Sequence, residues 1–221
     1  MLKVFTGVFV FLGGFAVMVL EIIGARYLAK DFGGDFYVWI SQIGVILIAL
    51  ALGYAIGGAL GDRFCRAGFL AVPLAIAGIF TFFIPKFTPR MLDAIVLRHP
   101  SGDIPMVWKK LDPALGSAVV FFLPCLVLAV ISPYMIRVTA RKLESVGTIS
   151  GLVYAASTVG SIAGVFLSGY VFIDYMTVTA IFQATGGVTL LLAFMSLVMD
   201  FWLGANGKAE KVKPSDHGRR I

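Results

Sequence analysis

Long apolar runs alternate with short polar stretches along the whole chain. Each run holds about 20 residues, which is enough for an α-helix to cross the hydrocarbon core of a bilayer. The runs predict six transmembrane helices. Their expected bounds are Val4–Leu28, Val38–Leu60, Ala67–Ile84, Leu115–Ile136, Ser150–Phe172 and Met176–Leu203.

Composition supports the same class of protein. The chain has 221 residues, of which 59% are hydrophobic and 14% charged, whereas soluble domains carry about 25% charged residues. The apolar run that starts at Val4 exceeds the about 7–15 residues of a signal-peptide core, so it is interpreted as the first span. Residues 1–203 are therefore predicted to form one all-α, polytopic membrane domain.

Basic residues in the flanks predict the orientation. Eleven of the 18 Lys and Arg residues fall on the side that holds both termini, which places that side in the cytoplasm by the positive-inside rule. The predicted location is an inner or plasma membrane. With a net charge of +6, the expected partners are anionic lipid headgroups rather than nucleic acid.

Two segments outside the spans have their own patterns. Residues 85–113 form a long outer loop in which Met91, Leu92 and Ile95 share one helical face, so the loop is predicted to lie in the outer interface. It is either a plain anchor or a lid over an outward-facing site. Residues 204–221 are polar and basic, and they predict a disordered cytoplasmic tail.

Small residues recur at four-residue spacing in two spans. The two stripes are Ala49, Gly53, Gly57 and Gly61 in the second span, and Ala156, Gly160, Gly164 and Ser168 in the fifth. Such stripes let another helix backbone approach closely. Because each stripe lies in the second helix of a three-helix half, and Glu21 precedes Arg26 by five residues as Ser132 precedes Arg137, the pattern predicts two inverted three-helix repeats. Inverted repeats of this kind make up each half of a major facilitator transporter.

The end of the second span carries a loop motif. Gly58, Gly61, Asp62, Arg63 and Arg66 stand in the order G-x-L-x-D-R-x-x-R, which resembles the cytoplasmic loop between helices two and three of major facilitator proteins. Asp62 is expected to bond a helix end or a basic partner, and the arginines to pair with acids or headgroups. The alternative is a simple basic turn after a glycine-rich helix.

Three longer stretches are similar to one family. FLGGFAVMVLEIIGARYLAKDFGG, VWISQIGVILIALALGYAIGGALGDR and VGTISGLVYAASTVGSIAGVFLSGYVF resemble the membrane region of spermidine synthase-like proteins, also called fused major facilitator/spermidine synthase proteins. Members of that family commonly continue into a soluble aminopropyltransferase-like domain. This chain has no G-x-G-x-x-G after a strand, so the resemblance assigns it no S-adenosylmethionine-type site.

Polar residues inside the spans predict a binding cluster. Glu21 is the one acidic residue well inside a predicted span, and Gln42 and Gln183 enter their spans from the same side at similar depth. Arg26 and Asp174 lie near the mouth of such a cluster. It is either a cation or proton site with Glu21 as the carboxylate, or a set of hydrogen bonds that holds the helices in register.

Other site chemistry finds little support. Cys65 and Cys125 are predicted at different depths, so no disulfide is expected. His99 and His217 are far apart in sequence and lie outside the six spans, so neither a metal site nor a catalytic set is expected. No cofactor is predicted.

These observations leave two main functions. The first is a non-catalytic membrane subunit or anchor, linked through the family resemblance to a polyamine or aminopropyltransferase-type partner. The second is a half-size transporter for a small cation such as a polyamine, working as a homodimer or with a partner. A complete membrane enzyme has the least support.

Overall fold

Six long helices dominate the part of the chain that the computed structural model describes, residues 2–34, 36–64, 66–98, 105–140 and 146–211. They are α1 (Leu2–Phe32), α2 (Phe36–Phe64), α3 (Ala71–Val96), α4 (Met106–Thr139), α5 (Val146–Leu167) and α7 (Val178–Lys211). A 3₁₀ turn (Ala67–Leu70) leads into α3, and a π-helical turn (Ser168–Phe172) joins α5 to the short α6 (Ile173–Tyr175). All six long helices are apolar enough to cross a membrane, so the prediction of a multi-pass helical membrane protein is confirmed.

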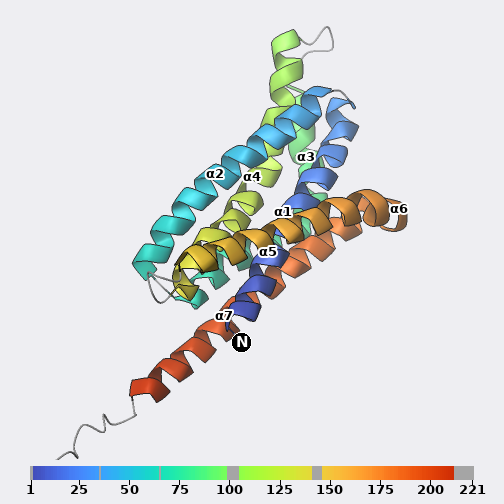
Figure 1. Cartoon of the computed structure of the whole chain (residues 1–221). Coiled ribbons are helices and arrows are strands. Elements are labelled where there is room, and N and C mark those ends of the chain that lie inside the picture. The colour runs from blue at the N-terminus through green and yellow to red at the C-terminus, as the bar shows by residue number, and fades with distance from the viewer. Residues whose placement is uncertain (1, 35, 65, 99–104, 141–145, 212–221) are drawn as a thin grey trace, which may run out of the picture.

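Two helices extend beyond their predicted ends. Residues 85–96 continue α3, and residues 106–113 form the first turns of α4, so the predicted outer loop is largely helical (Figure 1). In this region Figure 1 shows α4 projecting beyond α1 and α2. Likewise α7 runs to Lys211, into the segment predicted to be disordered. The rest of that tail, residues 212–221, lies outside the described residues.

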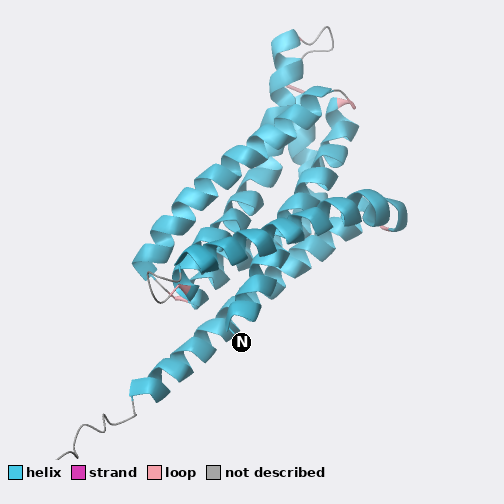
Figure 2. Ribbon diagram, in the orientation of Figure 1, coloured by secondary structure: helices cyan, strands magenta, loops and turns pink. Residues whose placement is uncertain are grey.

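Helices α1 and α4 form the centre of the bundle. In their most apolar segments 61% of the residues are buried, against 22% in α2 and 17% in α5. Helix α2 packs along α4, α5 packs along α1, and α3 packs along α7 (Figures 1 and 2). Each of these three extensive pairings therefore joins the first three spans to the last three.

Glycine makes the pairing of α2 with α4 possible. A β-carbon at Gly53 would lie 2.5 Å from the carbonyl oxygen of Leu126, and one at Gly57 would lie 2.6 Å from that of Val130. Real β-carbons essentially never approach a backbone atom so closely. The absence of side chains therefore lets the two backbones touch along one face.

The same contact recurs between α5 and α1. Gly160 lies against the carbonyl oxygen of Phe11, and a β-carbon at Gly164 would lie 2.6 Å from that of Phe15. Both small-residue stripes predicted from the sequence thus line close helix crossings.

Candidate functional site

Glu21 lies half-buried on α1. It is close enough to the buried thiol of Cys125 on α4 to interact with it electrostatically. Within the described part of the chain, no hydrogen bond or ion pair reaches the Glu21 carboxyl group. A half-buried carboxyl group without a partner among the described residues is the strongest functional feature of α1.

Gln42 makes structural hydrogen bonds instead of bonding Glu21. Its Oε1 accepts a 2.6 Å bond from the Ser117 hydroxyl on α4, and its Nε2 donates a 3.4 Å bond to the carbonyl oxygen of Leu20 on α1. The side chain is fully buried and packs against Gly24. Gln42 therefore fixes α2 to both central helices, in the turn of α1 that also carries Glu21.

The other members of the predicted cluster lie apart. Gln183 is half-buried on α7, while Arg26 on α1 and Asp174 on α6 are exposed. Within the described residues, none of the three makes a polar bond to Glu21 or to Gln42. The structure thus brings Gln42 beside the Glu21 turn and does not join the five residues in one network.

Side chains of the loop motif, at the end of α2, form ion pairs with α4 and α7. Asp62 pairs with Arg137 at the end of α4, with 2.6 Å between Oδ1 and Nε, and Arg66 pairs with Asp200 on α7 at 3.2 Å. The hydroxyl of Tyr134 also donates a 2.6 Å bond to the carbonyl oxygen of Arg66.

The remaining members of the motif differ in their surroundings. The Arg63 guanidinium lies 5.5 Å from the centre of the Phe64 ring, and Gly61 packs against Arg137. Gly58 has open space around it. Sequence reasoning expected basic partners for Asp62 but missed Tyr134 and Asp200, because neither is near the motif in sequence.

A small cavity lies where α1, α2, α4 and α5 meet. It has a volume of about 70 Å³, and its polar lining consists of Tyr54, Ser132, Ser157 and Ser161 beside the backbone of Gly14. Ser161 donates a 3.3 Å bond to the Gly14 carbonyl oxygen. Across the described residues, the hydroxyls of Tyr54, Ser132 and Ser157 have no hydrogen-bond partner.

Sequence reasoning missed this cavity. Its signal was present as Ser157 and Ser161, four residues apart on the stripe helix α5, but serine is common in membrane helices. Only the crossing of four helices shows that these hydroxyls face a shared space.

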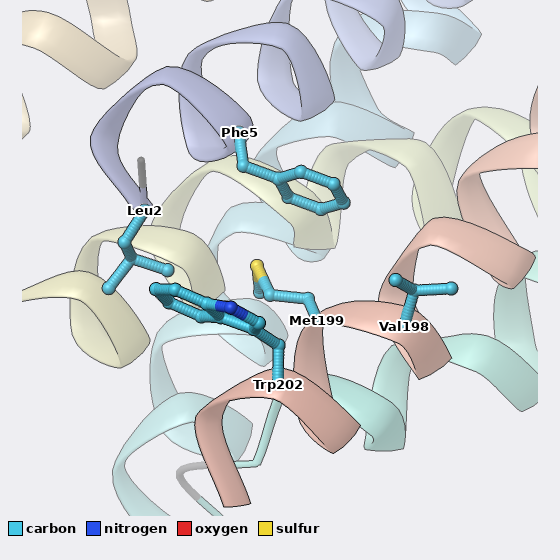
Figure 3. Close-up of a pocket in the computed structure, with 5 residues that line it drawn as sticks. All are labelled: Leu2, Phe5, Val198, Met199 and Trp202. Atoms are coloured by element: carbon cyan, nitrogen blue, oxygen red, sulfur yellow. The ribbon is translucent and has the colours of Figure 1, made fainter. Parts of the chain in front are cut away.

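A second pocket is apolar. Leu2 and Phe5 of α1 face Val198, Met199 and Trp202 of α7 around a volume of about 170 Å³ (Figure 3). Its side chains offer a single polar atom, the indole nitrogen of Trp202. This pocket is suited to hydrocarbon contact and lacks groups for chemistry.

The described residues contain no cluster of three or more His, Cys, Asp or Glu side chains able to hold a metal ion. Two polar features of the helix bundle remain to be explained, the Glu21 carboxyl group and the hydroxyl-lined cavity. Comparison with protein families, with curated proteins and with solved structures found no match for the chain.

Proposed function

We propose that the chain is half of a membrane transporter for a small cation, built from two inverted three-helix repeats and paired with a second six-helix unit. The observation that carries this proposal is the polar face formed by α1, α2, α4 and α5, where Glu21 and three hydroxyl groups have no partner among the described residues. The resemblance to major facilitator and spermidine synthase-like membrane regions agrees with it.

The glycine contacts support the inverted repeat. Gly57 of α2 meets the carbonyl of Val130 and the ring of Pro133 on α4, while Gly164 of α5 meets the carbonyl of Phe15 and the β-carbon of Met18 on α1. Both contacts pair the second helix of one half with the first helix of the other. Since Phe15 and Met18 have the same three-residue spacing as Val130 and Pro133, the two crossings match in detail.

Helices α3 and α7 also contact each other through glycines in a reciprocal way. A β-carbon at Gly78 of α3 would meet Leu190 of α7, and one at Gly186 of α7 would meet the backbone of Phe82 on α3. The step from Gly78 to Phe82 equals the step from Gly186 to Leu190. This agreement favours one two-fold relation that exchanges α1 with α4, α2 with α5, and α3 with α7.

The side of the bundle formed by α2 and α5 needs a protein partner to cover its polar groups. Tyr54 and Tyr154 are 46% and 56% exposed on α2 and α5, the two least buried spans. Unpaired hydroxyl and carboxyl groups are costly against lipid, because hydrocarbon offers them no hydrogen bonds. In a major facilitator transporter, a second six-helix half covers the equivalent face and the pathway runs between the two.

We further propose the orientation and location that the charge pattern predicts. Both termini face the cytoplasm of a cell with this protein in its inner or plasma membrane. The loop from Asp62 to Arg66 then lies at the cytoplasmic surface, where the exposed Arg63 contacts anionic lipid headgroups.

Site-directed cross-linking tests the pairing. In a background with Cys65→Ser and Cys125→Ala, cysteines are placed at Leu47 and Thr158, which are exposed on α2 and α5, and, as controls, at Ile76 and Phe194, exposed on α3 and α7. Oxidation in native membranes should cross-link the α2 and α5 variants, and leave the controls largely unlinked. Uniform cross-linking of all four, together with a monomeric mass by native mass spectrometry, contradicts the proposal.

A second function is an anchor for a soluble partner, for which the loop motif is the specific observation. Two ion pairs fix this loop, and the Arg66 side chain is still 77% exposed. A rigid basic surface suits an acidic protein partner. Native mass spectrometry of the complex distinguishes the two functions, since an anchor is isolated with a soluble protein and a transporter half with a second six-helix unit.

A further inference from the structure

We propose that the cavity between α1, α2, α4 and α5 binds a small monovalent cation of the size of Na⁺ through neutral oxygen atoms, with Glu21 as the counter-charge. This inference rests on the proposed transport function and names the ion-binding part of the same face. It assigns roles to Ser132, Ser157 and Tyr54, none of which is among the site residues predicted from the sequence.

Three hydroxyl groups that line the cavity make no hydrogen bond within the described residues. Ser132 is only 7% exposed, Ser157 is half-buried, and Tyr54 is 46% exposed. All three side chains border one space, so their oxygen atoms are available to a ligand there.

Glu21 lies on the face of α1 that borders the cavity. It follows Met18 of the cavity lining by three residues and Gly14 by seven, so it lies on the same face of α1. Side chains on a helix lean toward its N-terminus, which directs Glu21 back over the turn that borders the cavity. The nearest full charge to the cavity along α1 is thus negative and favours a cation over an anion.

The lining and the size of the cavity suit a small cation. Its polar lining consists of hydroxyl and backbone carbonyl oxygens, the ligands that hard cations prefer. A volume of about 70 Å³ admits an ion with a few water molecules, whereas pockets for larger organic ligands measure about 300–1,000 Å³. The cavity is therefore suited to an ion and too small for a bulky substrate.

The cavity lies on the proposed two-fold axis. The exchange that relates Val130 to Phe15, and Gly164 to Gly57, also relates residues of the cavity lining to one another. The related pairs are Val17 with Ser132, Leu50 with Ser157, and Tyr54 with Ser161. The space thus lies where the two repeats meet, and the second repeat contributes all three serines.

Thermal unfolding of the purified protein tests the site directly. The melting temperature is measured in NaCl and in choline chloride at equal ionic strength, starting from protein washed free of Na⁺. Near a hundred times the dissociation constant, Na⁺ should raise the melting temperature by about 5–10 °C. Ser132→Ala, Ser157→Ala and Glu21→Gln should each lose most of this rise.

The matched control is Ser150→Ala, which removes a serine from the same helix as Ser157 but outside the cavity lining. It should keep the full Na⁺ effect. Each variant is compared with itself in choline chloride, so a lower starting stability does not mimic lost binding. Equal melting temperatures of the wild type in both salts, or a Na⁺ effect that all four variants keep, would overturn the cation site. Because the cross-linking experiment uses no cation, either proposal can fail while the other stands.

Discussion

At the scale of single residues, two neighbouring glycines on α2 have opposite surroundings. A β-carbon at Gly57 would lie 2.6 Å from the Val130 carbonyl oxygen, whereas one at Gly58 would have nothing within 4 Å. The two positions share a helix and a depth. They therefore separate the effect of close backbone packing from the effect of helix propensity.

Substituting alanine at these positions should have opposite effects. Gly57→Ala must push α2 from α4 and should destabilise the bundle by about 1–3 kcal/mol, the usual cost of overpacking. Gly58→Ala should be neutral or stabilising by up to about 1 kcal/mol, because alanine is the better helix former. Thermal unfolding in detergent measures both. Equal effects would show that α2 and α4 do not touch at Gly57.

The two glutamines of the predicted cluster should also differ. Gln42→Leu leaves the buried Ser117 hydroxyl without its acceptor, and an unsatisfied buried group costs about 1–3 kcal/mol. Gln183→Leu removes no hydrogen bond to any described residue and should cost less than 1 kcal/mol, in the range of ordinary tolerated substitutions. Unfolding midpoints of the two variants check this. A larger loss from Gln183→Leu would favour the polar cluster as the sequence predicted it.

At the scale of helices, the sequence located the spans well but misjudged their ends. The six apolar runs correspond to helices, and the two small-residue stripes correspond to helix crossings. Both features produce a regular spacing of residue types that can be recognised in the sequence. The predicted outer loop begins at Pro85, yet α3 continues through Pro85 and Pro89. Contacts with α4 keep this part of α3 helical. Such contacts join segments that are distant in sequence, so the local sequence pattern does not reveal them.

The site was less accessible to sequence reasoning. In the repeat proposed above Val17 corresponds to Ser132, whereas the sequence pattern pairs Glu21 with Ser132, about one helical turn away. The partners Tyr134 and Asp200 of the loop motif lie far along the chain. No sequence motif marks contacts between segments that are far apart in the chain, so these partners are found only in the packed structure.

Among the described residues, an ion pair links the end of α3 to the start of α4 where the two helices extend beyond the bundle. Arg98 lies 2.6 Å from the buried carboxylate of Asp112, and its guanidinium lies 4.4 Å from the centre of the Trp108 ring. Arg98→Ala should therefore loosen the extension and increase hydrogen exchange around residues 105–112 by about 5–30-fold, corresponding to about 1–2 kcal/mol. Arg90→Ala, at an exposed position on α3, should leave exchange unchanged. Similar exchange in both variants would mean that the ion pair does not hold the extension.

At the scale of the whole molecule, the charge pattern and the even number of spans give a topology that labelling can check. Cysteines at Gly34 and Leu97, both exposed, should react from outside the cell with a membrane-impermeant maleimide in the background that lacks Cys65 and Cys125. A cysteine at Arg63 should react only after permeabilisation. The reverse pattern would place both termini outside and would move the loop motif to the outer surface.

The crossed pairing of the helices has a consequence for how the protein is made. The glycine face of α2 packs on α4, and α1 packs on α5, so each early helix finds its main partner in the later half of the chain. While α1 to α3 leave the ribosome, the translocon and lipid must shelter surfaces that no nascent segment yet covers. Assembly therefore cannot proceed as a stepwise stacking of hairpins, and the bundle closes only once α4 and α5 have been inserted.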